Sequence, residues 1–436
     1  MLDPTEHEPQ RKVMMIDTKS FYASCECVAL GMNPMKTMLI VMSQAENTNG
    51  GLVLAASPMA KKNLGIKNVD RRRDVPDDPR LIIKPPRMNY YIAMNKRIND
   101  VFREYVGDDD LQLYSIDESL LDVTSSWEYL KYRFGQDLTM KKLARIIQLE
   151  VKNKMGLYLT VGIGENPVMA KLALDLEAKK NHSLIGEWHY ETVPAKLWPI
   201  TDLTDVWSIG KRTAKTLNRL GIVSMRDLAF FDPYRLKKEL GVRGNELTAL
   251  AWGVDRSIVS HKYHPKENSI SNSQVLPRDY YLERDIKTVI REIGEQVASR
   301  LRSKHKMGGV VSLYIGSAMS ETVPGFSAQT KISPTNNSQM IVDALYKIFD
   351  AHYEGQVVRN IGVSVGKLEA DGHEQLDLFI PVETNVKQHK IDSTIDDIRH
   401  KFGTTALVKL SSKSKGGTMI QRAGLVGGHN GGNAYG

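Results

Sequence analysis

Short apolar runs and longer helical patterns alternate through the first 180 residues. Apolar runs predict buried strands at residues 13–16, 39–42, 52–56, 111–113, 120–123 and 157–163. Helical spacing predicts one helix over residues 88–105 and a second that carries Leu143, Ile147 and Val151 on one face. The order strand, helix, two strands, helix, strand predicts a sheet with helices on one face.

The rest of the chain follows two other patterns, joined by a polar stretch. Residues 188–255 are wholly helical in pattern, with glycine-containing turns at 208–212 and 240–244. Residues 256–268 are polar and predict a linker. Residues 269–369 run strand, long helix, two strands, helix, strand. That order predicts a second α/β unit of the βαββαβ type.

Two adjacent carboxylates lie between the strands of the hairpin that we predict at residues 111–123. Side chains of neighbouring residues on a flat strand point to opposite faces, whereas at a turn Asp117 and Glu118 could serve one site. Two buried carboxylates repel each other, and a divalent metal ion removes that repulsion. For an isolated Asp-Glu pair, the alternative is a solvated acidic turn. A third acidic residue, Asp17, ends the first predicted strand and favours the metal site.

Aromatic and basic residues follow these acidic positions. Phe21 and Tyr22 come directly after Asp17, although Asp17 could also simply cap a helix that begins near Ser20. Lys61 and Lys62 lie on a short predicted helix that ends at Gly65. Lys171 lies about one turn into a helix that Asn166 and Pro167 begin.

Two further basic regions are candidates for contact with phosphates. The turn at Gly210 and Lys211 exposes backbone N–H groups at a helix start, which can hold a phosphate; a plain helical turn is the alternative. Arg300, Arg302 and Lys304 crowd the end of the long helix. There they suit either the negative helix terminus or a nucleic-acid backbone.

Composition narrows the classes of protein that remain. The 436 residues exceed one ordinary core and predict several domains. A net charge of +8 permits an anionic partner such as nucleic acid. No apolar run reaches about 18 residues, so we expect no membrane span, and the polar N-terminus is not a signal peptide. Cys25 and Cys27 are too few for a zinc site and predict reduced thiols in a cytoplasmic protein.

Residues 17–26 together with 114–118 resemble the Y-family translesion DNA polymerases, most nearly their bacterial UmuC-like branch. Further matches lie at 86–91, 161–164, 170–173, 207–210 and 220–222. The resemblance implies an α/β right hand with a ferredoxin-like palm, small fingers, a helical thumb with helix-hairpin-helix turns and a βαββαβ little finger. Expected bounds are 11–20 and 87–180 for the palm, 21–86 for the fingers, 181–255 for the thumb and 269–370 for the little finger. An N-terminal extension (1–10), the linker at 256–268 and a C-terminal tail (371–436) complete the chain.

The resemblance also implies the chemistry. Asp17, Asp117, Glu118 and the carbonyl of Thr18 would hold two Mg²⁺ ions for nucleotidyl transfer from deoxynucleoside triphosphates to a primer 3′ end on template DNA. Tyr22, with Phe21 beside it, would exclude a 2′-hydroxyl. Lys171 and either Lys61 or Lys62 would neutralise the triphosphate. The sequence leaves no stretch for a proofreading nuclease, which predicts error-prone synthesis. The resemblance also implies a place in the SOS response to DNA damage.

A short peptide beyond the second α/β unit predicts a protein partner. Gln375, Leu376, Leu378 and Phe379 are set among polar residues that cannot bury the apolar side chains. The peptide resembles those that bind the DNA sliding clamp, and the family resemblance allows a UmuD-like accessory subunit. We expect the glycine-rich end of the tail to be disordered.

Two other functions compete with this interpretation. A nucleotide cyclase also uses a palm-like sheet with two-metal carboxylates, but it has no use for thumb hairpins or a clamp peptide. A non-catalytic DNA-binding scaffold could keep the fold, but all three carboxylates are present.

Overall fold

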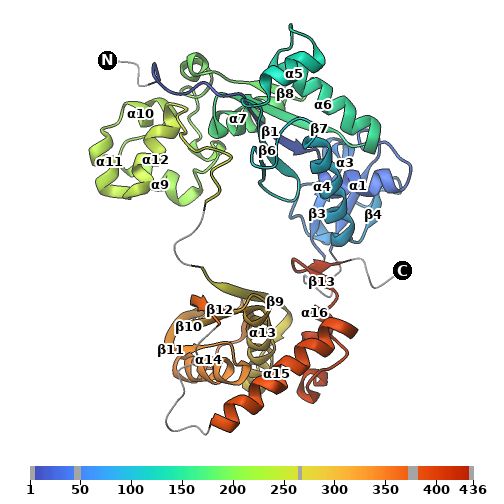
Figure 1. Cartoon of the computed structure of the whole chain (residues 1–436), viewed down its shortest axis with the longest axis vertical. Helices are drawn as coiled ribbons and strands as arrows, with labels where there is room; N and C mark the ends of the chain where they lie inside the picture. The colour runs from blue at the N-terminus through green and yellow to red at the C-terminus, as the bar shows by residue number, and fades with distance from the viewer. Residues whose placement is uncertain (1–4, 44–50, 264–267, 372–381, 432–436) are drawn as a thin grey trace.

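A five-stranded sheet lies at the centre of the first half of the chain. The computed structural model describes residues 5–43, 51–263, 268–371 and 382–431 (Figure 1). The sheet has the strand order β5-β6-β1-β7-β8, antiparallel except for the parallel pair β7–β8. Its strands are β1 (Val13–Thr18), β5 (Leu111–Leu113), β6 (Glu118–Asp122), β7 (Leu159–Gly164) and β8 (Ile185–Glu187). The first four confirm the predicted strand order, and β8 was not expected.

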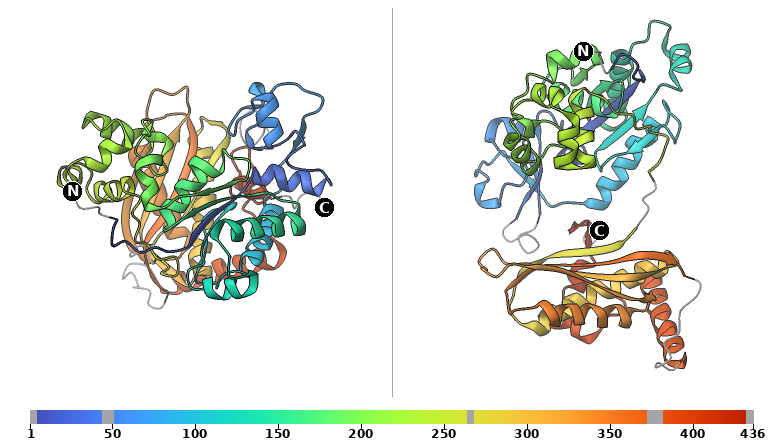
Figure 2. Two further views of the ribbon diagram at one scale, coloured as in Figure 1. Left: turned by 90° about the horizontal axis from the view of Figure 1, so that it is seen from above. Right: turned by 90° about the vertical axis from the view of Figure 1, so that its left-hand side faces the viewer.

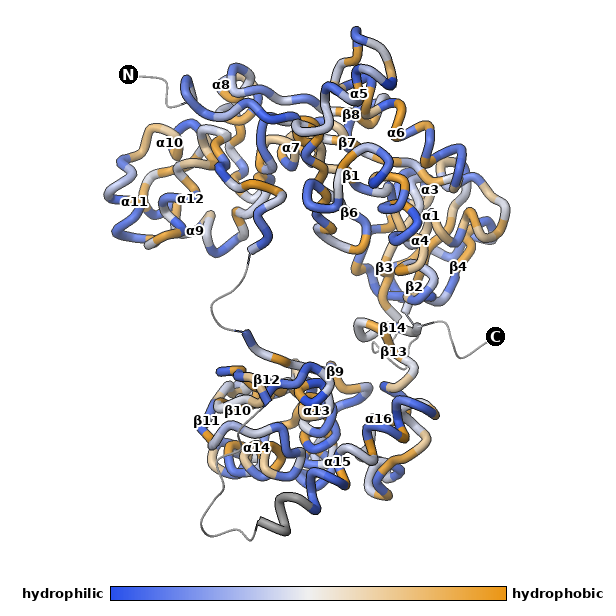
Figure 3. The backbone as a smooth tube through the Cα atoms, viewed as in Figure 1, coloured by the Kyte–Doolittle hydropathy of each residue, from blue (hydrophilic) through white to orange (hydrophobic). Residues whose placement is uncertain are grey.

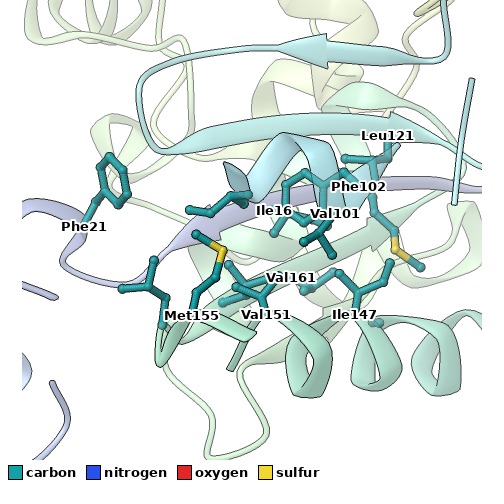
Figure 4. Packing of buried hydrophobic residues seen from close by; sticks show 14 of the residues in the cluster. Ile16, Phe21, Val101, Phe102, Leu121, Ile147, Val151, Met155 and Val161 are labelled. Carbon is teal, nitrogen blue, oxygen red and sulfur yellow. The ribbon is translucent and has the colours of Figure 1, made fainter. Parts of the chain in front are cut away.

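Helices cover both faces of this sheet, so the prediction of helices on one face was wrong: α7 packs on the second face. Helices α4 (Met88–Phe102) and α6 (Met140–Met155) pack on the face that carries Met14 and Ile16 (Figure 4). Helix α5 (Trp127–Phe134) contributes the buried Leu130 to the same core. Val13 and Met15 point the other way and meet α7 (Pro167–Ala173). Asp17 shares the second face because side chains alternate along the strand.

A smaller sheet follows β1 in the chain. Its strand order is β3-β2-β4, with β2 (Leu39–Met42) antiparallel to β3 (Val53–Ala56) and parallel to β4 (Ile82–Lys84). Helix α1 (Phe21–Ala29) joins it to the central sheet, and α3 (Pro58–Leu64) follows β3 and ends at Gly65, as predicted.

Short helices form the next unit. They are α8 (Val193–Lys196), α9 (Lys211–Arg219), α10 (Met225–Phe230), α11 (Pro233–Leu240) and α12 (Val242–Ala251). Their apolar side chains share a core with Met169 and Leu172 of α7, which attaches this unit to the central sheet.

The second α/β unit has the predicted βαββαβ order. It comprises β9 (Ile270–Tyr280), α13 (Glu283–Ser303), β10 (Lys306–Ser317), β11 (Phe326–Thr335), α14 (Ser338–His352) and β12 (Val358–Ala370). The four strands pair antiparallel in the order β11-β10-β12-β9. Both helices lie on one face, and Figure 2 shows the other face turned toward the rest of the molecule.

The chain beyond this unit is folded where the structure describes it. Helix α15 (Val382–Phe402), which Figure 3 shows to be hydrophilic over most of its length, precedes α16 (Met419–Arg422). The strands β13 (Leu425–Val426) and β14 (His429–Asn430) then form a hairpin. The expectation of disorder was therefore wrong for residues 424–431. Gly427 and Gly428 both have positive φ, so they form a two-residue hairpin turn rather than a flexible segment.

None of the helices that the structure describes is long and apolar enough to cross a membrane.

Candidate active site

The three acidic residues meet where β1 and β6 pair. Asp17 lies directly opposite Glu118 in the antiparallel register. Asp117 is the last residue of the turn before β6, and its carbonyl accepts a 2.9 Å hydrogen bond from the Thr18 N–H group. A second bond, from the Asn95 amide to the Ile116 carbonyl at 2.8 Å, fixes the turn against α4. The pairing of β1 with β6 therefore brings together carboxylates that are about a hundred residues apart in sequence.

Burial and mutual repulsion make the ionised forms of these carboxylates less favourable. Burial raises the pKa of Asp17; the Lys179 ammonium opposes this shift, and the charges of Asp117 and Glu118 add to it. Burial also raises the pKa of Asp117, against a 2.8 Å hydrogen bond from the Ser115 hydroxyl. Groups with this pattern favour a bound cation, because a cation offsets both costs.

Lysine ammonium groups occupy the space beside the carboxylates. The Lys179 Nζ atom lies 3.3 Å from Asp17 Oδ2 and 3.9 Å from Glu118 Oε1, so it bridges the two strands. Lys171 donates to Glu118 Oε1 at 2.6 Å, and both lysines also pair with Asp175. The carboxylates of Asp17 and Glu118 thus already share a cation across the β1–β6 pair.

Carboxylate oxygens are the ligands that Mg²⁺ prefers, so the chemistry of Asp17, Asp117 and Glu118 fits this ion. Across the described residues, no three acidic, histidine or cysteine side chains converge closely enough to hold a metal as they stand. Lys171 pairs with Glu118 and Lys179 pairs with Asp17 in the metal-free arrangement.

A cavity of about 750 Å³ opens beside the carboxylates. Asp17, Asp117, Tyr22 and Ala55 line it, and the cavity is also lined by four lysines that bring positive charge: Lys19, Lys61, Lys62 and Lys179. Burial lowers the pKa of Lys61, and Lys19 and Lys179 lower it further. Crowded ammonium groups around an open space favour a polyanionic ligand.

Tyr22 is held in place by stacking against the ring of Tyr91. Its ring lies 4.5 Å from that of Tyr91, at an interplanar angle of 15°. Tyr91 is fully buried, and its hydroxyl donates to Glu26 at 2.8 Å. Glu26, also buried, accepts two bonds from Arg87, at 2.9 and 2.8 Å. A buried charge pair thus fixes the ring that supports Tyr22.

The turn from β1 into α1 sets the direction of Tyr22. Ser20 adopts a left-handed backbone (φ 49°, ψ 49°), which costs a residue with a side chain about 1 kcal/mol. The Ser24 hydroxyl supports the turn by donating to the Lys19 carbonyl at 2.6 Å. This turn lets one strand end carry Asp17 while the helix that follows carries Tyr22. Strained backbone of this kind is frequent at functional sites.

Glycines in β7 let α7 approach the sheet closely. A Cβ atom at Gly162 would lie 2.1 Å from the Ala170 carbonyl oxygen, and one at Gly164 would lie 2.4 Å from the Ala170 nitrogen. Helix α7 then continues as a π-helical turn, η2 (Leu174–Ala178). Such turns carry one extra residue and are frequent at functional sites. Lys179 follows this turn directly.

The structure separates the lysines that the sequence offered as candidates. Lys61 interacts electrostatically with Asp17, Lys19 and Lys179, and both Lys61 and Lys62 line the 750 Å³ cavity. Lys171 instead lines a neighbouring cavity of about 470 Å³ together with Tyr114 and Trp207. Sequence reasoning missed Lys19 and Lys179; the position of Lys19 two residues after Asp17 was an available signal.

The expected DNA-contacting residues have differing surroundings. Gly210 is the N-cap of α9, and Lys211, the first residue of that helix, is exposed. Arg300 and Lys304 are exposed at the end of α13, whereas Arg302 is largely buried and paired with Asp392 and Asp396 of α15. Arg302 therefore anchors the C-terminal helix here rather than presenting its charge to solvent. The clamp-like residues Gln375, Leu376, Leu378 and Phe379 lie outside the described residues.

Comparisons with known proteins identify the family. The impB/mucB/samB family matches residues 16–175, its C-terminal domain matches residues 267–378, and the IMS family HHH motif matches residues 190–222. UvrX of Bacillus subtilis (strain 168), named for UV-damage repair, is 38% identical over 422 residues, which span 97% of this chain and 98% of that protein. The chain belongs to the Y family of DNA polymerases.

Other comparisons agree with this Y-family membership. A protein named DNA polymerase IV 2, also from Bacillus subtilis, is 34% identical over 424 residues, 96% of this chain and 99% of that protein. A solved Y-family chimera of Dbh and Dpo4 superposes with a TM-score of 0.65 at 24% identity, covering 82% of this chain and 99% of the chimera. The fold is therefore the right hand of the Y family, with palm, fingers, thumb and little finger.

Proposed function

We propose that this Y-family member is an error-prone translesion DNA polymerase, which adds deoxynucleotides to a primer 3′ end on damaged templates without proofreading. The observation that carries the proposal is the pairing of Asp17 with Glu118 across β1 and β6, together with a lysine-lined cavity that Asp17 and Asp117 both line. A nucleotide cyclase is no longer a competing function, because the chain belongs to the Y family.

The proposed metal site consists of Asp17, Asp117, Glu118 and the Thr18 carbonyl. Two Mg²⁺ ions held there would activate the 3′-hydroxyl and neutralise the leaving pyrophosphate. The acidic side chains bind the cations, and Ser115 and Thr18 hold the Asp117 turn in place through hydrogen bonds. Lys179 would leave the carboxylates and donate to the triphosphate, where Lys19 and Lys61 add positive charge.

The surroundings of the cavity support lesion tolerance and sugar selection. Ala55 lines the cavity, and its small side chain would leave room for a distorted base pair. Tyr22 stands at the cavity wall with its ring fixed by Tyr91, which suits a group that must reject a 2′-hydroxyl by contact. Phe21 is buried beside it and supports α1. The primer end would lie along Tyr114 and Lys171, in the neighbouring cavity.

DNA would be held by groups that do not read sequence. The backbone at Gly210 and the charge of Lys211 suit a phosphate, as do Arg300 and Lys304. We extend this proposed DNA contact to the uncovered face of the four-stranded sheet, where Tyr314 is half exposed.

We assign the palm to residues 11–20 and 87–180, with β8 as an additional strand, and the fingers, thumb and little finger to 21–86, 181–255 and 269–370.

Primer extension on a template with an abasic site tests the activity. The parent should extend past the lesion with Mg²⁺, while Asp117→Ala and Glu118→Ala should not extend at all. Asp108→Ala, which removes an exposed carboxylate near the hairpin, is the matched control and should extend normally. Undiminished extension by either of the first two variants would reject the metal assignment. A scaffold would bind DNA without extending it.

The clamp peptide carries a second, separable proposal. Replacing Leu378 and Phe379 with alanine should abolish stimulation by the sliding clamp and leave basal synthesis intact, because the peptide lies far in sequence from the carboxylates. Equal stimulation of variant and parent would reject it. A UmuD-like accessory subunit remains a prediction, which a binding assay with such a protein would test.

A further inference from the structure

The chain after the little finger is attached to that domain by many polar contacts. Arg302 of α13 pairs with Asp392 and Asp396 at 3.2 and 2.6 Å, and Asp392 also accepts the Ser338 N–H group that begins α14. Further along, Thr418 donates to the buried Glu292. These contacts make residues 387–422 part of the little-finger body.

The hairpin that follows reaches a different part of the molecule. Leu425 lines a cavity beside α13, together with Glu292 and Arg422. Val426, the next residue, packs against the apolar core of the palm and fingers. Side chains alternate along a strand, so β13 presents one side chain to each body. Figure 1 shows the hairpin between the little finger and the lower ends of β3 and α4.

The contact on the palm side satisfies a helix end that lacks its own cap. The N-cap of α4, Arg87, supplies no side-chain hydrogen bond to the first turn. The first N–H groups of a helix have no partner within it. The Asn89 N–H group donates instead to the Gly431 carbonyl at 3.1 Å. Gly431 is buried, and a Cβ there would lie 3.1 Å from the side-chain Nδ2 atom of Asn89, so this residue lies close against the first turn of α4.

We propose that the first turn of α4 is a docking surface for the chain's own C-terminal hairpin, Leu425–Gly431, which holds the little finger at a fixed position against the palm in the DNA-free enzyme. The docked hairpin fixes the little finger through a small contact. The apolar side chain of Val426 packs against the core, and the Asn89 N–H group donates to the Gly431 carbonyl.

Energy transfer between two dyes tests the docking on the full-length protein. Tyr132→Cys on α5 and Met319→Cys in the β10–β11 loop supply exposed labelling positions. The native Cys25 and Cys27 are buried, and burial raises the pKa of Cys27 to about 11, so they should label little. Protein without the new cysteines measures that background.

The DNA-free parent should give one narrow distribution of transfer efficiency. Val426→Asp and a chain that ends at Ala423 should broaden and shift it, while Ile420→Asp, at an exposed apolar residue of the same tail, should not. In hydrogen exchange, the Asn89 amide should exchange at least about tenfold faster in the shortened chain. Unchanged distributions in both hairpin variants, an equal change in Ile420→Asp, or unchanged Asn89 exchange would overturn the proposal. Neither measurement needs DNA or nucleotide, so each stays informative whatever the activity.

Discussion

Tyr22 and Tyr91 stack with their ring centroids 4.5 Å apart and their planes inclined by 15°. We predict that Tyr22→Ala loses at least about tenfold of the discrimination against ribonucleotides, a typical loss when a pocket wall is removed. Tyr91→Leu should lose part of it, because Tyr22 then gains freedom, and Tyr91→Phe should keep it. The measurement is kcat/KM for a deoxynucleotide over that for the matching ribonucleotide. Unchanged discrimination in Tyr22→Ala would reject the sugar-selecting role.

Lys179 should contribute to nucleotide binding more than its neighbours do. We expect Lys179→Ala to raise KM for the incoming nucleotide about ten- to a hundredfold, since a hydrogen bond to a charged group contributes about 1.5–3 kcal/mol. Lys180→Ala, which changes the exposed next residue, is the matched control and should be neutral. An equal effect of both variants would show that general charge, rather than the position of Lys179, is what matters.

Asp117 should lower the stability of the metal-free protein. Burial raises the pKa of Asp117 in the folded protein. The folded protein is therefore most stable below the pKa that Asp117 has in the unfolded chain, where the carboxyl is protonated, and it loses stability as pH rises through the folded pKa. At neutral pH, Asp117→Asn should therefore unfold at the same temperature as the parent or higher. Mg²⁺ at ten times its dissociation constant should stabilise the parent by about 1.4 kcal/mol and the variant by less. A lower unfolding temperature for the metal-free variant would contradict this prediction.

The ion pair between the buried Glu26 and the partly exposed Arg87 should stabilise the fold. Glu26→Gln leaves the guanidinium of Arg87 without its carboxylate, and we expect a loss of about 2 kcal/mol, less than for a fully buried pair because Arg87 is 41% exposed. Glu128→Gln, at an exposed ion pair on α5, should leave the unfolding temperature unchanged. Urea unfolding of both variants measures the difference, and equal stabilities would refute it.

Sequence patterns predicted the elements whose side chains repeat with a clear period. The strands β1, β6 and β7 were predictable as short apolar runs, because their side chains are buried on both faces of the sheet, and both βαββαβ helices were predictable because their apolar positions face one core. The family resemblance joined Asp17 and Asp117 in one site, because no periodic pattern shows which strand end lies beside a turn about a hundred residues later. No local pattern showed that Glu26 pairs with Arg87, since 61 residues separate them and only the packed fold joins α1 to α4.

Other features depend on packing that a periodic pattern does not record. The residues of β8 are too few to show a period, and the C-terminal hairpin is recognised only by two consecutive glycines. The position of Lys179 at the cavity follows a π-helical turn, which the sequence pattern does not show.

The π-helical turn Leu174–Ala178 determines the direction in which the Lys179 ammonium group points. Removing one residue from Leu174–Ala178 would let the turn relax to an ordinary α-helix, and Lys179, the C-cap residue, would rotate by about 100° around the axis. Lys179 would then point away from Asp17 while the chain kept the lysine and its charge. A single-residue deletion should thus separate the presence of a cation from its direction, which substitution of the lysine itself cannot do.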